Sequence, residues 1–472
     1  MTWNPDHIAD RRLRTARDRH IEVHDVMRSL IATREFSDMV ALVADARPPC
    51  GTGRPRRHSS ASVTFLYFLS MLFPSLAKVE SYLSFGNNWE SYRRRLHTSF
   101  PDDPLLGKGS PAPTKSLLRH WKQVFDREFG EKVADLMFVH GVLAAAEMGI
   151  GVNTGTMLNP GIEAGMFGDA VVIRPMSRYK AGDMGYNQRL DRWQQRRYDK
   201  DATYYTDGTG TRAYGNQFVH LSARTGAANE VVTFGIHPLF KTEPIRESDL
   251  VLRLVSDLKN ALPEMAMVHY DKALRGRSVD QIWSMQLLPM IGVYDKSGKT
   301  TAQVPLGKKT INGLKVDLFA HRGGINIKAL DGTFIPLSAT KLSFIPNAGG
   351  TYRVYCDYVV PSGTNCDTRL WGGNVQQRMN SPKKADFVYG EHIRAHAPGS
   401  PEWRNLYGQR SMAESVNSWM KSELLVHNRA RSLNQTHQWI DLMFGLMMRN
   451  HRSLMLYRRR TQLARTASPP AA

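Results

Sequence analysis

The order of apolar patterns along the 472-residue chain predicts an α/β protein. The predicted protein consists of a mixed β-sheet flanked by helices, a β-rich insertion and an N-terminal region made only of helices. Two observations support this prediction. Residues 1–150 carry apolar side chains at helical spacing, whereas runs of β-branched residues first appear beyond residue 160. Strand-like and helix-like segments then follow one another through residues 160–293, as expected when helices cover the faces of a sheet.

Composition indicates a globular protein with affinity for polyanions. Hydrophobic residues make up 42% of the chain and aromatic residues 9%, which are values of a folded rather than a disordered protein. Lys and Arg number 63 against 43 Asp and Glu, so the formal net charge is +20. This excess predicts binding to nucleic acid first, although charge alone does not separate DNA from RNA or from an anionic membrane surface.

The cysteines and the apolar segments favour a cytoplasmic protein. Cys50, Cys356 and Cys366 form neither a CxxC pair nor a zinc-binding spacing. The N-terminus is charged from its first residues, unlike a signal peptide. The apolar run 63–76 is interrupted by Pro74 and is too short to span a bilayer.

The first 150 residues contain three helical blocks, at 19–46, 59–96 and 115–148. Segments rich in Pro and Gly, 47–57 and 101–114, separate them, and Thr114 is the predicted N-cap of the third block. Aromatic and basic side chains are interleaved on the second and third blocks, for example Trp89 with Arg93 and Trp121 with Lys122. We predict a region that binds DNA ends, with a purely structural helical scaffold as the alternative.

Residues 160–293 alternate between strand and helix patterns. Strands are predicted at 167–174, 217–223 and 230–236, followed by a helix, a buried strand ending at Asp271, a second helix and a last strand at 287–294. This order is that of the RNase H-like fold. Short alternating strands between turn sequences form the predicted β-rich insertion at 294–395. The core then resumes at 396–460 with two helices, and 461–472 is predicted to be a disordered tail.

A helix predicted at 407–421 has two different faces. A carboxylate on a helix can hold a divalent cation, and Arg and Lys one or two turns away can hold phosphates. We therefore predict a catalytic helix, with an ordinary solvated polar face as the alternative. At about 100° per residue, the polar face carries Tyr407, Arg410, Glu414, Asn417 and Lys421, and the apolar face carries Met412, Ala413, Val416 and Met420.

Metal-dependent phosphoryl transfer requires carboxylates that converge on two divalent cations. Glu414 supplies one, and Asp271 supplies a second because it ends a buried strand, although a helix N-cap is the alternative for such an Asp. Two residues compete for the first position. Asp169 stands within FGDAVVIR, where the apolar run continues a strand, whereas Asp207 stands in YYTDGTGTR, where the glycines favour a turn. We favour Asp169 as the catalytic and metal-binding residue.

The chain resembles a known family around these residues. Residues 407–421 resemble the Tyr-x2-Arg-x3-Glu-x6-Lys signature of DDE transposases from bacterial insertion sequences, and YDKALRG at 270–276 is similar to their second-Asp motif. The resemblance covers roughly residues 160–455. It implies metal-dependent cleavage at transposon ends, strand transfer into target DNA, and two Mg²⁺ ions for which Mn²⁺ substitutes. It also implies that Tyr407, Arg410 and Lys421 contact DNA.

The resemblance also leaves alternatives open. The family's first Asp usually stands in Asp-Gly-Thr, which Asp207 matches and Asp169 does not, whereas YDKDATYY at 198–205 is similar to a stretch that precedes the family's second strand. The resemblance implies that the chain forms a homodimer when it assembles on DNA. It also implies that the cytoplasmic protein associates with the bacterial nucleoid when it is bound to DNA. Trp283 and Trp371 are candidates for stacking on a flipped base, with core packing as the alternative. Other classes are an RNase H-like endonuclease or resolvase, or a DNA-binding protein without catalysis.

Overall fold

The computed structural model describes residues 16–46, 57–206, 210–227, 229–243, 245–293, 303–347, 349–382 and 386–467. The predicted break at 47–57 therefore lies almost wholly outside the described residues. The chain forms two compact units. Unit 1 contains the described residues up to Gly141, together with Val172–Asn216 and those from Trp419 onward. Unit 2 contains Val142–Val171 and Gln217–Ser418.

Unit 1 is mainly helical, as the sequence predicts for its N-terminal part. Several helices begin at a side chain that caps the first turn: the hydroxyl of Ser59 accepts from the N–H of Ser62, and that of Thr114 accepts from Leu117. The Thr114 cap is as predicted. The helices are α2 (Ala16–Ile31), α3 (Arg34–Asp45), α4 (Ser60–Met71), α5 (Leu76–Ser84), α6 (Asn88–Ser99), α7 (Lys115–Lys122), α8 (Arg127–Glu147), whose last residues belong to unit 2, and α14 (Gln435–Ala467).

Aromatic stacking and one buried charge network hold α4 against α14. Every residue of α4 is buried, and the rings of Tyr67 and Phe444 stack with their centroids 3.9 Å apart. The Tyr67 hydroxyl donates to Asp441 Oδ1 at 2.7 Å, and Ser432 and Lys122 also contact this carboxylate. Burial alone raises the pKa of Asp441, but Lys122 and these hydrogen bonds outweigh it and leave the pKa below its usual value.

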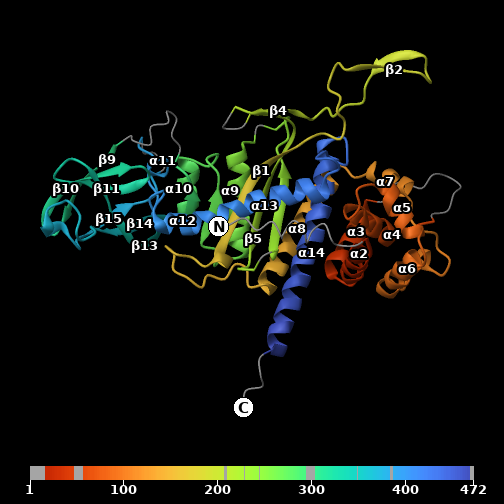
Figure 1. The fold of residues 1–472 in the computed structure, drawn as a ribbon, viewed down its shortest axis with the longest axis horizontal. Helices are drawn as coiled ribbons and strands as arrows, with labels where there is room; N and C mark the ends of the chain where they lie inside the picture. The colour runs from red at the N-terminus through yellow and green to blue at the C-terminus, as the bar shows by residue number, and fades with distance from the viewer. Residues whose placement is uncertain are drawn as a thin grey trace. The chain divides into compact units, whose positions relative to one another are not determined.

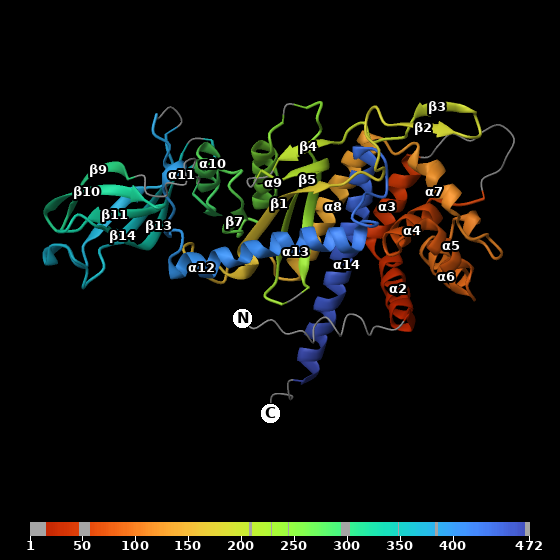
Figure 2. The ribbon, with the colours of Figure 1, turned by 45° about the horizontal axis from the view of Figure 1, so that its top comes forward.

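Two features of unit 1 differ from the sequence prediction. Helix α14 continues to Ala467, so residues 461–467 are helical where a disordered tail was predicted. A separate two-stranded ribbon, β2 (Met184–Asn187) and β3 (Arg192–Gln195), follows β1, and β4 (Thr203–Thr206) pairs with the start of β5 (Figure 2). These short strands carry no apolar alternation because most of their residues are exposed.

The central sheet is mixed, as predicted, and most of it lies in unit 2 (Figure 1). Strand β1 lies between β5 and β7, β8 follows β7, and β6 pairs with β5. The β1–β7 and β7–β8 pairs are parallel, whereas β5 and β6 are antiparallel. The elements are β1 (Gly165–Ile173), β5 (Arg212–Arg224), β6 (Val231–Pro238), α9 (Glu247–Ala261), β7 (Met267–Tyr270), α10 (Arg277–Ser284) and β8 (Leu288–Ile291).

The predicted insertion folds as two small antiparallel sheets. The turn between β9 and β10 is made by Asn312 and Gly313, whose φ angles of 47° and 84° suit a two-residue hairpin turn. One sheet has the order β12-β11-β10-β9 and the other β13-β14-β15. Their strands are β9 (Val304–Ile311), β10 (Leu314–His321), β11 (Gly324–Lys328), β12 (Phe334–Pro336), β13 (Ser338–Pro346), β14 (Tyr352–Val359) and β15 (Asn374–Arg378).

Three short helices complete unit 2: α11 (Tyr389–His392), α12 (Pro401–Tyr407) and α13 (Ser411–Trp419), the last residue of which belongs to unit 1. Within the described part of the chain, no single helix has both the length and the apolar composition needed to cross a membrane. Helices α4 and α5 satisfy those two criteria only when taken together, and they meet at a bend of 114°.

Asp441→Ala should destabilise unit 1 by about 3 kcal/mol, because it leaves the half-buried Lys122 ammonium without its counter-ion. Chemical denaturation followed by circular dichroism measures this loss. Glu131→Ala removes an exposed partner of Arg127 and serves as the control, with an expected change of about 0.5 kcal/mol or less. Equal changes in the free energy of unfolding for the two substitutions would show that the Asp441 carboxylate does not stabilise unit 1 more than an exposed ion pair does.

Candidate active site

Two adjacent parallel strands of unit 2 bring Asp169 and Asp271 together. The printed register of β1 and β7 runs to Phe167 opposite His269. Asp169 lies in β1 and Asp271 directly after β7, each two residues beyond that last pair. Because side chains alternate between the faces of a strand, equal spacing from a registered pair directs both carboxylates to the same face.

Charged groups close to Asp169 shift the pKa of its carboxyl group. The pKa of Asp169 is raised to about 6, chiefly by burial and next by the charge of Asp271. The Arg410 guanidinium and the N–H of Ala170 act in the opposite direction, whereas Glu414 adds a small increase. The structure therefore brings Asp169, Asp271, Glu414 and Arg410 of the sequence prediction into one electrostatic neighbourhood.

The segment 407–421 is helical but changes helix type three times. Helix α12 ends at Tyr407, a 3-10 turn spans Gly408–Arg410, α13 begins at Ser411, and a π-helical turn follows at Met420–Leu424 (Figure 2). The predicted apolar face is buried at Ala413, Val416 and Met420, and half-buried at Met412.

Asn417 is the residue of this helix that approaches Asp169 most directly. Its side-chain amide donates to Asp169 Oδ2 at 2.8 Å, whereas its own carbonyl oxygen is buried without a partner among the described residues. The sequence places Asn417 on the polar face with Glu414, but neither its burial nor its contact was predicted. The helical spacing of three residues from Glu414 was the available signal.

Glu414 and Arg410 form a loose pair on the surface. Arg410 Nη1 lies 3.7 Å from Glu414 Oε1, and the Glu414 side chain is 64% exposed. An exposed pair one helical turn apart contributes only a few tenths of a kcal/mol, so Glu414 is free to reorient. The Tyr407 ring stacks on that of Trp403, with ring centroids 5.0 Å apart.

A fourth carboxylate lies near the pair and was missed by the sequence analysis. The Tyr270 hydroxyl donates to Glu247 Oε1 at 2.9 Å, and the Gln217 amide donates to Oε2 at 3.0 Å. The pKa of Glu247 is raised to about 7, because burial and the charges of Asp271 and Asp169 outweigh the opposing hydrogen bonds from Tyr270 and Gln217. No motif marked Glu247, because its first-turn position in α9 is common for any Glu.

No contact that the structure describes joins the other candidate residues to this cluster. Lys421 is exposed in the π-helical turn and belongs to unit 1. Asp207 lies outside the described residues. Trp283 is fully buried, so it is a core residue, whereas Trp371 is 37% exposed and donates to the carbonyl of Thr364.

Within the described ranges, no group of three His, Cys, Asp or Glu side chains is arranged to hold a metal ion. Asp169 and Asp271 nevertheless fit a divalent cation, because the charge of Asp271 raises the pKa of Asp169, and a cation between the two carboxylates would remove this repulsion. Glu414, which points toward Arg410, would have to turn to join them.

No known family model matches the chain, and no curated protein does. Among solved structures, the chain is similar to a piggyBac transposase in a cryo-EM structure of its synaptic complex with hairpin DNA. The two chains share 9% sequence identity at a TM-score of 0.39, and the alignment covers 95% of this chain and 76% of that one. A TM-score this low does not establish a shared fold, so the likeness carries no argument about function.

Asp169→Asn should stabilise the protein in metal-free buffer. A carboxyl whose pKa is raised on folding, from 3.8 to about 6, holds its proton better in the folded state, so its stabilising contribution is lost as the pH rises through that window. At pH 7.5 the neutral amide should therefore raise the thermal unfolding midpoint by a few degrees, whereas at pH 4 the two proteins should melt together. Differential scanning fluorimetry with EDTA measures both.

Asp257→Asn is the matched control, since Asp257 is exposed on α9 in the same unit. It should leave the midpoint unchanged at both pH values. A wild-type midpoint that is already as high as that of Asp169→Asn at pH 7.5 would show that the carboxylates do not repel one another.

Proposed function

We propose that this chain is a DDE-type DNA transposase, which cleaves DNA at transposon ends and transfers the freed strand into target DNA. The observation that carries the proposal is the convergence of Asp169 and Asp271 from adjacent parallel strands, next to Glu414 and Arg410. One carboxylate within a strand, a second directly after the neighbouring strand and a third on a later helix match the donor set of metal-dependent phosphoryl transfer. The chain's net charge of +20 favours a polyanionic substrate.

An RNase H-like core is part of this proposal. The order β6-β5-β1-β7-β8, with an antiparallel pair on one side and parallel strands on the other, supports it. So does the position of the β-rich insertion, which separates Asp271 from the helix that carries Glu414.

Each residue has a role in the proposed reaction. Asp169, Asp271 and Glu414 would hold two Mg²⁺ ions, which Mn²⁺ could replace, and these ions supply an activated water and stabilise the leaving oxygen. Asn417 orients Asp169 through its 2.8 Å hydrogen bond. Arg410 balances the acidic cluster and lies ready to bind a phosphate. Lys421 and Tyr407 complete the proposed DNA contacts, and a homodimer would assemble on DNA.

Asp169→Asn, Asp271→Asn and Glu414→Gln should each abolish cleavage of a linear fragment that carries the element's own end, because a neutral amide holds Mg²⁺ poorly. DNA binding should stay close to normal. Asp207→Asn is the control and should keep measurable activity in Mg²⁺ and in Mn²⁺. Loss of cleavage in Asp207→Asn, but not in Asp169→Asn, would assign the first carboxylate to Asp207.

The same assay separates strand transfer from simple hydrolysis. A transposase should join the cleaved end to a supercoiled plasmid, whereas a resolvase or other endonuclease would cut without joining. Binding without cleavage in either metal would leave a DNA-binding protein and overturn the proposal.

Lys421→Ala should weaken end binding and make the dependence of affinity on salt shallower by about one unit of the log–log slope, as expected when one phosphate contact is lost. Fluorescence anisotropy over a salt series measures the slope. Lys341→Ala removes an exposed charge from β13 of the insertion and is the control. An unchanged slope for Lys421→Ala would show that Lys421 does not contact a DNA phosphate.

A further inference from the structure

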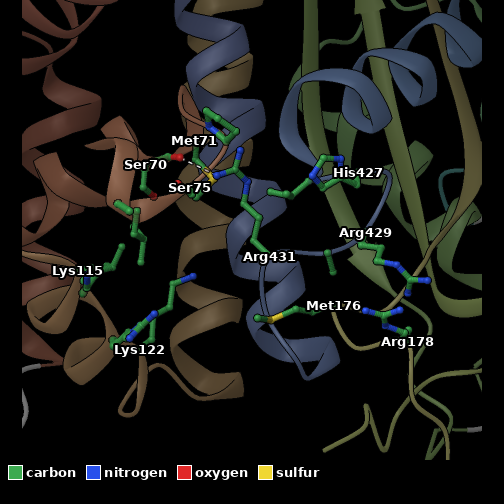
Figure 3. A pocket seen from close by; sticks show the side chains of 17 residues that line it. Ser70, Met71, Ser75, Lys115, Lys122, Met176, Arg178, His427, Arg429 and Arg431 are labelled. Atoms are coloured by element: carbon green, nitrogen blue, oxygen red, sulfur yellow. Dashed lines mark hydrogen bonds between the residues drawn. The ribbon is translucent and has the colours of Figure 1, made fainter. Parts of the chain in front are cut away.

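Unit 1 contains a cavity of about 680 Å³ that the proposed reaction does not use (Figure 3). It is bounded by the end of α4, the start of α5, one face of α7, and two segments at 176–178 and 426–431. Its volume falls within the range of about 300–1,000 Å³ that is typical of ligand pockets.

Helix α7 gives the cavity much of its charge through residue spacing alone. Lys115, Leu118, Arg119 and Lys122 recur at intervals of three and four residues, so they share one face of the helix, and all four line the cavity. Figure 3 shows Lys115 and Lys122 on one side of the cavity and Arg178 on the other.

All charged residues that line the cavity are cationic: Asp and Glu are absent from its seventeen lining residues. Four of its six Lys and Arg side chains already have partners in the protein. Lys115 lies 3.4 Å from Glu80, and Lys122 contacts Asp441. Arg429 and Arg431 donate to neutral backbone carbonyls, which fix the guanidinium groups in place without cancelling their charge.

Arg119 and Arg178 are the two cations left for a ligand. Both are exposed, and neither makes an ion pair or hydrogen bond with any residue that the structure describes. They come from α7 and from the segment after β1, so they approach the cavity from separate elements. Arginine is well suited to such a site because its planar guanidinium can bind two phosphate oxygens at once.

Most of the remaining lining is apolar, apart from Ser70, Ser75 and His427. Met71, Leu76, Leu118, Met176 and Val426 give the cavity a surface that a hydrated inorganic anion would not fill. Thioether side chains such as Met71 and Met176 pack well against aromatic rings. A lining that combines apolar side chains with cations fits a ligand with a flat apolar body and a phosphate, which describes a nucleotide.

We propose that this cavity binds an unpaired nucleotide of the DNA, with its phosphate on Arg119 and Arg178 and its base against Met71 and Met176. This inference rests on the proposed function, because the phosphate and base are supplied by bound DNA. A paired base inside a duplex cannot enter such a cavity, so the cavity favours DNA with an unpaired end.

Binding in metal-free buffer tests the inference without any cleavage. The probes are a fluorescent blunt duplex and the same duplex with a few unpaired thymidines at one 3′ end. The wild-type protein should bind the overhang duplex more tightly. Arg119→Ala and Arg178→Ala should each weaken that binding about tenfold, the loss of one charge-assisted hydrogen-bonded contact, and should affect the blunt duplex far less.

Two further variants separate the cavity from general charge and from misfolding. Arg459→Ala removes an exposed arginine of α14 that does not line the cavity, and should lower the affinity for both probes slightly and equally. Ala77→Trp places bulk over the cavity at an exposed position and keeps every charge. It should abolish the preference for the overhang while the protein melts as the wild type does.

Each other outcome overturns the inference. Equal affinity of the wild-type protein for both probes would show that the cavity does not bind an unpaired nucleotide. Equal losses of affinity on both probes would show that Arg119 and Arg178 contact the duplex in general and not the overhang. If free thymidine monophosphate binds the wild type with the same dependence on both arginines, but the overhang adds nothing, the ligand is a free nucleotide. Asp271→Asn should still bind the overhang duplex more tightly than the blunt duplex. The proposed catalytic role of Asp271 and the proposed nucleotide binding by the cavity can therefore be tested separately.

Discussion

The parallel pairing of β1 with β7 is the constraint on which the candidate active site depends. It fixes Asp169 and Asp271 at equal distances from a registered pair, so both carboxylates share one face of the sheet. A slip by one residue would turn one of them to the opposite face. The neighbouring residues prevent such a slip, because Met267, Val268 and Tyr270 are all fully buried. The apolar core of unit 2 thus holds in place two like charges that repel each other.

The pKa values of neighbouring groups show that this arrangement is electrostatically unfavourable. Burial raises the pKa of Asp169 and of Glu247, and burial also lowers the pKa of His269 to about 3, so this histidine stays neutral and offers no counter-charge. Arg410 is the cation that offsets the cluster. Rigid strands therefore fix two carboxylates, whereas Glu414 lies on a helix interrupted by a 3-10 turn and remains exposed. Precise sites are built on rigid elements, and an adjustable third group adds a means of closing the site.

The sequence predicted the elements that bury apolar residues and missed those that do not. The runs around Asp169 and Asp271 are apolar enough to mark β1 and β7, so the order of the core and the carboxylate pair could be anticipated. The β2–β3 ribbon is mostly exposed and carries no alternation to detect. Asn417 was placed on the correct helix face, but its contact with Asp169 depends on a separation of 248 residues in sequence. The cavity gathers residues from 70 to 431, and local patterns cannot reveal such an assembly.

The two roles of Arg410 link this electrostatic design to the proposed chemistry. In the structure its charge lowers the pKa of Asp169 and it pairs loosely with Glu414, so one guanidinium serves two carboxylates. A pair at 3.7 Å on an exposed surface is weak, and little free energy is needed to separate it. In the proposed reaction, a bound cation would neutralise the carboxylates, and the Arg410 guanidinium would no longer be needed as their counter-ion. Arg410 would then be available to a phosphate of the proposed DNA substrate.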